Sequence, residues 1–212
     1  MNPLSPAYDP KITRRYSART IEHKVENKTA LQKELGWPME PKAPIVCLPA
    51  GMSDALGGHL LKEFLPGLLS LPIELLVMGR GSSDYGKLFT GLADERGHRI
   101  AIIPHDEDSL RKLLAASDIA LFLTDPSDMP ELQDCLHYGV VPIAPECKSL
   151  KDYNPVQETG NAFLAPEATP WLIFAALVRA LETFKFPFDW RTIQRHGMES
   201  VGGAKEVVEE EE

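Results

Sequence analysis

The chain has 212 residues, 43% of them hydrophobic, and a formal net charge of −9 at pH 7. This length and apolar content can form the core of one globular domain with small appendages, and no run of about 18 apolar residues is present to span a bilayer. The acidic balance, with no basic stripe to neutralise phosphates, argues against nucleic acid and membrane surfaces as partners.

The first predicted elements are a helix and a buried strand. Residues 18–35 are predicted to form a helix, because Ser17 is a plausible N-cap and Gly36 with Pro38 ends the apolar stripe. Residues 44–49 are almost entirely apolar, which is typical of a strand that is buried on both faces. The opening of the chain therefore indicates an α/β domain.

The rest of the chain repeats this alternation of strand and helix. Further strands are predicted over residues 73–78, 99–103, 119–123, 140–144 and 161–165, and further helices over residues 59–69, 83–95, 107–116, 130–138 and 169–184. Strands separated by helices at this rhythm predict a Rossmann-like parallel sheet with helices on both faces. We expect residues 1–40 to be an opening segment and helix, residues 41–200 the Rossmann-like domain, and residues 201–212 an acidic disordered tail.

The cysteines and the N-terminus bear on location and cofactors. Cys47, Cys135 and Cys147 are odd in number and lie in or beside predicted core elements, which is typical of free cysteines in a reducing compartment. The first residues lack the basic-then-apolar order of a secretory signal, so we expect a cytoplasmic protein. No Cys or His pair has metal-ligand spacing, and we expect neither a metal nor a cofactor.

Ligands of a doubly wound sheet bind beyond the carboxyl ends of its strands, so the loops there hold the candidate site. The best local candidates for a phosphate or ribose cradle are Gly79, Arg80, Gly81 and Ser82, since the glycines permit close backbone approach and Arg80 is a cation. An ordinary strand-to-helix turn is the alternative. Asp106 is a further candidate, and its alternative is to cap the following helix. Neither loop places a nucleophile beside an oriented base, so no catalytic residue is predicted.

Several motifs resemble the C-terminal domain of the bacterial glycogen and starch synthases. The matching segments are NKTALQKELGWP (27–38), MGRG (78–81), AASD (115–118), LHYGVVP (136–142), TGNAFL (159–164) and QRHGM (194–198). The resemblance extends from about Asp9 to Met198. It implies one Rossmann-like half of a GT-B glycosyltransferase. Enzymes of this family transfer glucose from ADP-glucose or UDP-glucose to an α-1,4-glucan with retention of configuration and without a metal ion.

The loop after the first strand departs from the family pattern. The resemblance implies an Arg and a Lys in a Gly-Arg-Leu-Thr-x-Gln-Lys-Gly sequence, which stabilise the departing diphosphate. Laid without gaps on residues 50–57, these positions are Gly51 and Leu56. Gly57 and Gly58 at the end of the loop remain candidate nucleotide contacts. The cradle is thus expected to lack both cations.

Two further family segments are altered. The Glu-Pro-Cys-Gly segment, whose Glu contacts the donor sugar, falls on residues 126–129, although a shift of one residue places Asp125 at the Glu position. The Thr-Gly-Gly turn, which offers backbone N–H groups to the donor phosphates, falls on residues 147–149. There Lys148 restores one charge, while Ser149 replaces a glycine.

These losses predict a domain without ordinary catalysis by itself. One preorganised group that stabilises developing charge contributes about 2.7–4 kcal/mol, a hundred- to thousandfold in rate. The sequence also lacks an acceptor-side N-terminal domain and departs from the family after Met198. We therefore expect a pseudoenzyme that binds ADP-glucose, ADP or an α-glucan, or that regulates a separate N-terminal-half or synthase subunit. The donor-binding half of a split ADP-glucose-dependent synthase and a pure protein-interaction scaffold remain alternatives.

Overall fold

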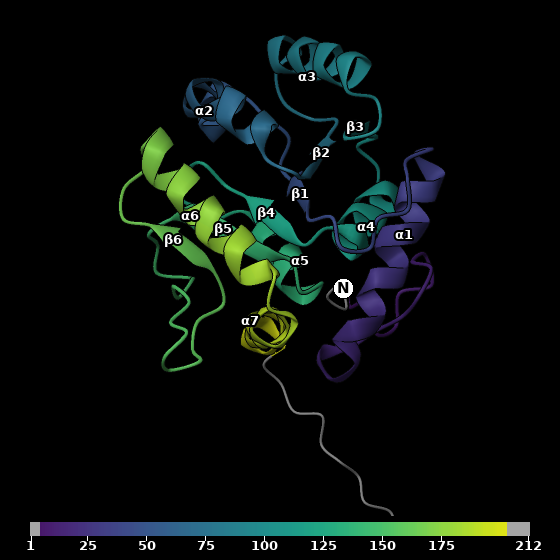
Figure 1. Ribbon diagram of the computed structural model, residues 1–212, viewed down its shortest axis with the longest axis vertical. Helices are drawn as coiled ribbons and strands as arrows, with labels where there is room; N and C mark the ends of the chain where they lie inside the picture. The colour runs from purple at the N-terminus through teal and green to yellow at the C-terminus, as the bar shows by residue number, and fades with distance from the viewer. Residues whose placement is uncertain (1–4, 203–212) are drawn as a thin grey trace, which may run out of the picture.

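The computed structural model describes residues 5–202, which form an α/β domain around one parallel sheet (Figure 1). The strands are β1 (Ile45–Leu48), β2 (Glu74–Met78), β3 (Ile100–Ile103), β4 (Ile119–Leu121), β5 (Val141–Pro145) and β6 (Phe163–Ala165). Their order is β3-β2-β1-β4-β5-β6, and every neighbouring pair is parallel. In this doubly wound order the winding reverses between β1 and β4. The Rossmann-like fold predicted from the sequence is confirmed.

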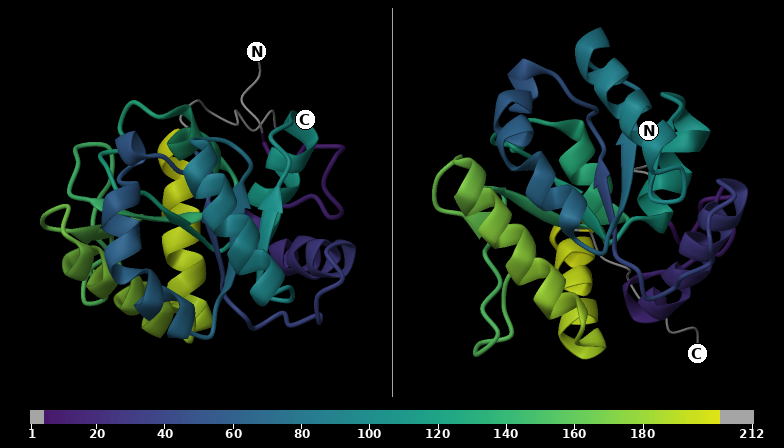
Figure 2. Two further views of the ribbon diagram at one scale, coloured as in Figure 1. Left: turned by 90° about the horizontal axis from the view of Figure 1, so that it is seen from above. Right: turned by 45° about the horizontal axis from the view of Figure 1, so that its top comes forward.

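Helices cover both faces of the sheet, as the two views of Figure 2 show. The helical elements are η1 (Ala18–His23), α1 (Lys24–Glu34), η2 (Asp54–Leu56), α2 (Gly58–Ser70), α3 (Ser83–Glu95), α4 (Glu107–Ala116), α5 (Pro130–His137), α6 (Pro170–Phe184) and α7 (Pro187–Val201). Side chains of α2, α3 and α6 pack on one face, and side chains of α1, α4 and α5 pack on the other.

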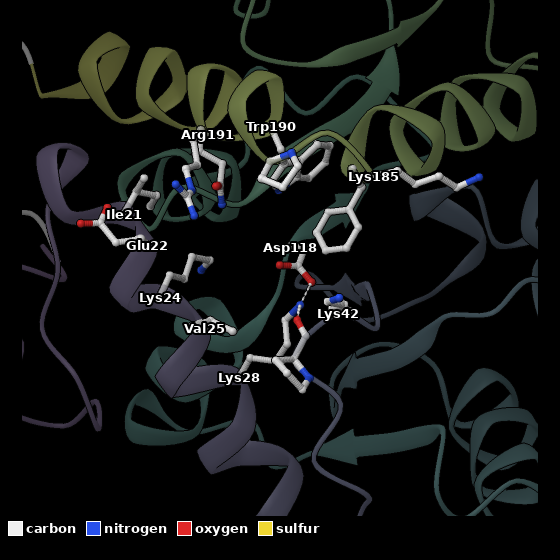
Figure 3. Close-up of a pocket in the computed structure, with 14 residues that line it drawn as sticks. Ile21, Glu22, Lys24, Val25, Lys28, Lys42, Asp118, Lys185, Trp190 and Arg191 are labelled. Atoms are coloured by element: carbon white, nitrogen blue, oxygen red, sulfur yellow. Dashed lines mark hydrogen bonds and ion pairs between the residues drawn. The ribbon is translucent and has the colours of Figure 1, made fainter.

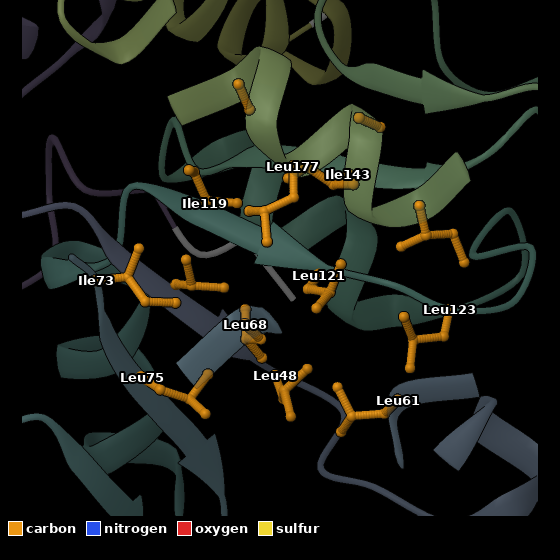
Figure 4. Close-up of a cluster of buried hydrophobic side chains, with 14 of the residues drawn as sticks. Leu48, Leu61, Leu68, Ile73, Leu75, Ile119, Leu121, Leu123, Ile143 and Leu177 are labelled. Atoms are coloured by element: carbon orange, nitrogen blue, oxygen red, sulfur yellow. The ribbon is translucent and has the colours of Figure 1, made fainter. Parts of the chain in front are cut away.

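The alternation of side chains along each strand supplies one core on each face. In β1, Val46 and Leu48 belong to the cluster beneath α2 and α6, whereas Ile45 and Cys47 belong to the cluster beneath α4 and α5. Figure 4 shows the first cluster, in which Leu177 of α6 lies over the strands. All four residues of β1 are buried, which explains the uninterrupted apolar run in the sequence.

The opening helix differs from the prediction at its start. Residues 18–23 form a 3-10 helix with a kink at Thr20 (φ −123°, ψ 33°), and the α-helix begins only at Lys24. Its end is as predicted, because Gly36 adopts φ 71° and the N–H of Trp37 donates to the carbonyl of Gln32 at 2.8 Å. This is the left-handed glycine that closes many helices.

Helix α7 was not predicted. It starts with Pro187, whose fixed φ suits a first helical position, and it buries Trp190, Ile193, Gln194 and Gly197. These residues lie against α5, η1 and α6. The helix thereby ties the two faces of the domain together.

Most of the predicted tail lies outside the residues that the structure describes. Val201 is the last residue of α7, and residues 203–212 lie outside the described part of the chain. Within residues 5–202 no helix has the length and apolar character needed to cross a membrane. In the same range no three His, Cys, Asp or Glu side chains gather as metal ligands.

Candidate functional site

The loops after β1 and β4 meet at the point where the winding of the sheet reverses. Ligands of doubly wound sheets bind in the crevice outside the carboxyl ends of the strands at this point. The loop after β1 covers residues 49–57 and the loop after β4 covers residues 122–129. Gly57 packs directly on the second loop, since a Cβ added to it would lie 2.6 Å from the Cβ of Leu123. The two loops are therefore in close contact at the centre of the candidate site.

The loop after β1 is also hydrogen-bonded to the loop after β2. The N–H of Met52 donates to the carbonyl of Arg80 at 3.2 Å, and the N–H of Ser82 donates to the carbonyl of Met52 at 3.0 Å. Gly51 and Gly81 permit this contact. Gly51 has φ 72° and Gly81 has φ 117°, and a Cβ on either would lie 1.9 Å from a backbone oxygen of the facing loop. Gly81, predicted to cradle a phosphate, thus allows one loop to approach the other.

Gly51 falls at the position of the Arg when the synthase pattern is laid without gaps on this loop. The direction in which its side chain would leave the backbone is filled by the carbonyl oxygen of Arg80. A residue with a side chain requires this loop to move away from its neighbour. Placing an arginine at this position therefore requires a change in the backbone of the loop as well as a change of side chain.

The start of α2 is covered by an aromatic side chain. Tyr85 of α3 lies against Gly58, because a Cβ added to Gly58 would be 2.2 Å from the Cζ of the tyrosine ring. The hydroxyl of Tyr85 donates to Oδ1 of Asp54 at 2.6 Å. Burial, followed by this hydrogen bond, raises the pKa of Tyr85 to about 12, so the hydroxyl remains a donor at neutral pH. The helix N-terminus, which favours anions through its dipole, is flanked by the Asp54 carboxylate.

Arg80 is the cation of the predicted cradle, and it is already paired. Its Nη1 donates to Oε1 of Glu131 at 2.6 Å, with 52% of the arginine side chain exposed and 11% of the glutamate side chain exposed. Glu131 belongs to the first turn of α5. No local pattern in the sequence identifies this partner, because 51 residues separate the two.

The remaining predicted residues have mostly structural contacts. Gly79 packs against β3, where a Cβ would lie 3.0 Å from the carbonyl oxygen of Ile103. Ser82 is the N-cap of α3 and Asp106 is the N-cap of α4. Asp106 accepts hydrogen bonds from the N–H and the hydroxyl of Ser109, both at 2.8 Å, and these bonds lower its pKa. Capping, the predicted alternative for Asp106, describes what it does in this structure.

Lys148 and Asp125 are the remaining candidate residues at the carboxyl edge of the sheet. Lys148 is exposed beyond β5 and forms no ion pair with any side chain of residues 5–202. Asp125 accepts hydrogen bonds from the N–H of Ser127 at 2.9 Å and from its hydroxyl at 2.6 Å, which lower the pKa of the carboxyl. The carboxylate is therefore held in a local turn, and it stays ionised near neutral pH.

The chain is similar over most of its length to glycogen synthases. It is 32% identical over 204 residues to a glycogen synthase of Clostridium perfringens, which covers 93% of this chain and 42% of the relative. It is 32% identical over 202 residues to a glycogen synthase of Caldicellulosiruptor saccharolyticus, with 92% and 42% covered. The chain thus spans less than half the length of these curated relatives. No family model matches the chain.

Solved structures share the fold. The catalytic domain of starch synthase IV from Arabidopsis thaliana, bound to ADP and acarbose, superposes with a TM-score of 0.78 at 23% identity, covering 92% of this chain and 42% of the other. Anabaena Alr3699/HepE in complex with UDP and glucose superposes with a TM-score of 0.62 at 15% identity, covering 84% and 47%. Both place the sheet in the GT-B class of half-domains.

Proposed function

The chain is a homologue of the C-terminal domain of the glycogen and starch synthases, and on this basis we propose that it binds the nucleotide part of a nucleotide sugar without transferring the sugar. It acts as a binding or regulatory module of the synthase type. We place it in the cytoplasm, where its three free cysteines stay reduced. The similar structures that were solved with ADP or with UDP and glucose support a nucleotide ligand.

One observation carries the proposal: the carbonyl of Arg80 fills the side-chain direction of Gly51. A synthase of this family uses protein cations instead of a metal to stabilise the departing diphosphate. A group of this kind contributes about 2.7–4 kcal/mol, or a hundred- to thousandfold in rate. The cation cannot be restored here by one substitution, since the loop would have to separate from its neighbour.

The charges at the crevice oppose a diphosphate further. Arg80 is neutralised by Glu131 at 2.6 Å, and Asp54 lies beside the start of α2. A phosphate that contacted the remaining N–H groups of Arg80 would share the guanidinium with the Glu131 carboxylate, which offsets its charge. The nucleoside is therefore expected to supply most of the affinity, and the phosphates little.

Calorimetric titration with adenosine, AMP, ADP, ADP-glucose and UDP tests this assignment. ADP is expected to bind less than about tenfold more tightly than adenosine, a difference under about 1.4 kcal/mol. With ADP-glucose and glycogen, the purified chain is expected to release no ADP above background. A preference of a hundredfold or more for ADP over adenosine, or robust turnover, would overturn the proposal.

Two matched variants examine the part played by Arg80. Arg80→Ala is expected to change the affinity for ADP less than threefold, because Glu131 already offsets the charge of the guanidinium. Glu131→Gln removes the competing charge, and the affinity for ADP is expected to rise severalfold while that for adenosine stays constant. A tenfold loss on Arg80→Ala would show instead that Arg80 holds the phosphates.

The same assays separate the other roles. Transfer that appears only after addition of the N-terminal half of a synthase would identify a split enzyme. Binding of maltoheptaose in the absence of nucleotide binding would identify a glucan-binding module. Binding of neither ligand would leave protein interaction as the function.

A further inference from the structure

A second cleft lies at the opposite edge of the sheet from the candidate nucleotide site (Figure 3). It borders Pro41 and Lys42, in the segment that precedes β1, and Asp118, which directly precedes β4. Its other walls are α1, the end of α6 and the start of α7. The cleft has a volume of about 640 Å³, within the usual range of small-molecule sites.

The charged side chains at the base of the cleft are held by the fold. Nζ of Lys28 lies 2.6 Å from Oδ2 of Asp118 and donates to the carbonyl of Ala43 at 2.9 Å. Lys24 donates to the carbonyls of Leu114 and Ala115 at 2.6 and 3.0 Å, which cap the end of α4. These groups are satisfied, so they form a rigid polar base and leave the ligand contacts to other residues.

The sides of the cleft are apolar and aromatic. Phe184 and Trp190 contact each other edge to face, with ring centroids 5.1 Å apart. Ile21 and Val25 face them from the η1–α1 side, and Pro187 completes this wall. Such a surface fits the body of an aromatic or aliphatic molecule.

Two cations near the opening are free. Lys42 and Arg191 are exposed, and neither forms an ion pair or a hydrogen bond through its side chain within residues 5–202. In Figure 3, Arg191 extends from α7 toward α1. Lys185, a third basic residue at the cleft, is already paired with Glu182 at 2.6 Å.

The composition of the cleft is unusual for this chain. Five of its fourteen lining residues are basic and two, Glu22 and Asp118, are acidic, although the whole chain has a net charge of −9. Because Lys28 and Lys185 are paired with carboxylates, the cations of the cleft without an ion pair or a side-chain hydrogen bond in the described part of the chain are Lys42 and Arg191. Together with the apolar walls they favour a ligand that carries both a negative charge and an apolar body.

We propose that this cleft binds a small amphipathic anion, an aromatic or aliphatic phosphate ester or carboxylate. Its apolar body lies against Phe184 and Trp190, and its charged group pairs with Arg191. The planar guanidinium of Arg191 matches both acid groups bidentately. The site is independent of the nucleotide site, since the two occupy opposite edges of the sheet.

Titration with phenyl phosphate, followed by calorimetry and by two-dimensional NMR, tests this inference. Phenyl phosphate is expected to bind at least tenfold more tightly than inorganic phosphate or phenol alone, because only the ester carries both features. Benzoate, the corresponding carboxylate, is expected to compete with it. ADP is expected not to displace it, which distinguishes this cleft from the nucleotide crevice.

Variants assign the binding to named residues. Arg191→Ala is expected to weaken phenyl phosphate about tenfold, and Val25→Glu, on the exposed part of the apolar wall, is expected to weaken it similarly by repulsion. Lys87→Ala removes an exposed lysine of α3 outside the cleft and is expected to have no effect. Thermal unfolding of each variant verifies folding. The inference fails if phenyl phosphate does not saturate the chain by about 10 mM, if both cleft variants bind like the native protein, or if ADP displaces it.

Discussion

The contact between the loops after β1 and β2 predicts a large difference between two glycines that share one backbone conformation. Gly51 has φ 72° and Gly36 has φ 71°. A Cβ on Gly51 would lie 1.9 Å from the carbonyl oxygen of Arg80, whereas a Cβ on Gly36 would meet nothing within 4 Å. Replacing each by Ala therefore separates the effect of the close contact from the effect of the left-handed backbone.

The magnitudes follow from these two geometries. A left-handed conformation costs a residue with a Cβ about 1–2 kcal/mol, and this applies equally to both sites. At Gly51 the loop must also move, which breaks the hydrogen bonds from Met52 to Arg80 and from Ser82 to Met52, at 3.2 and 3.0 Å. Each contributes about 0.5–1.5 kcal/mol. We expect Gly36→Ala to destabilise the protein by about 1–2 kcal/mol and Gly51→Ala by about 2 kcal/mol more. The gain from a stiffer unfolded chain cancels in the comparison.

Urea and thermal unfolding of the two variants and the native protein measure the difference. For a protein of this size, 2 kcal/mol corresponds to about 4–8 °C in melting temperature. Gly51→Arg, which restores the family residue, is expected to be destabilised at least as much and to gain no transfer activity. Equal destabilisation of Gly36→Ala and Gly51→Ala would refute the reasoning, because the carbonyl of Arg80 would then exclude nothing.

Three further predictions concern polar contacts. Tyr85→Phe removes the donor to Asp54 and is expected to lower the free energy of unfolding by about 1–2 kcal/mol; an unchanged urea midpoint would contradict this. Lys24→Met leaves two carbonyls at the end of α4 without a donor and is expected to cost about 2–3 kcal/mol. Because burial lowers the pKa of Lys24 to about 7, the unfolded chain binds more protons above that pH, so the native protein should gain stability relative to the variant between pH 7 and 10. Asp106→Ala should lower the melting temperature at pH 7, and the difference should vanish as the pH falls through the pKa of Asp106, which the bonds from Ser109 lower; a constant difference down to pH 2 would contradict it.

The strands were predictable because a strand that is buried on both faces consists almost entirely of apolar residues. In β1 every residue is buried and apolar. β2 is also buried throughout, and its one charged residue, Glu74, accepts hydrogen bonds from Gln32 at 3.0 and 2.8 Å. The apolar pattern in the sequence of helix α7 is weaker. Only Lys185 and Phe186 separate it from α6, and its buried side includes Gln194 and Gly197, which interrupt an apolar stripe. Proline at its first position was the available indication.

The candidate site was predictable only in outline. The sequence places Gly51 at the position of a family cation, but it does not show that the carbonyl of Arg80 occupies the space beside it. Likewise, Arg80 is recognisable as a cation in a glycine-rich loop, while its partner Glu131 lies on another helix. Both facts depend on contacts between segments far apart in the chain, and the periodicity of the sequence does not predict such contacts.

Charge is distributed in opposite senses at the two edges of the sheet. At the carboxyl edge, Asp54 flanks the start of α2 and Arg80 is neutralised by Glu131. At the amino edge, Arg191 and Lys42 stand unpaired beside an apolar cleft. A diphosphate approaching the first edge meets the Asp54 carboxylate, an arginine paired with Glu131, and Lys148, which is unpaired within residues 5–202. An anion approaching the second edge meets Arg191 and Lys42 beside the ion pair of Lys28 with Asp118. The fold of a nucleotide-sugar enzyme does not by itself determine where this domain attracts negative charge. The charged side chains determine it, and among the described residues Arg191 and Lys42 attract an anion to the amino edge.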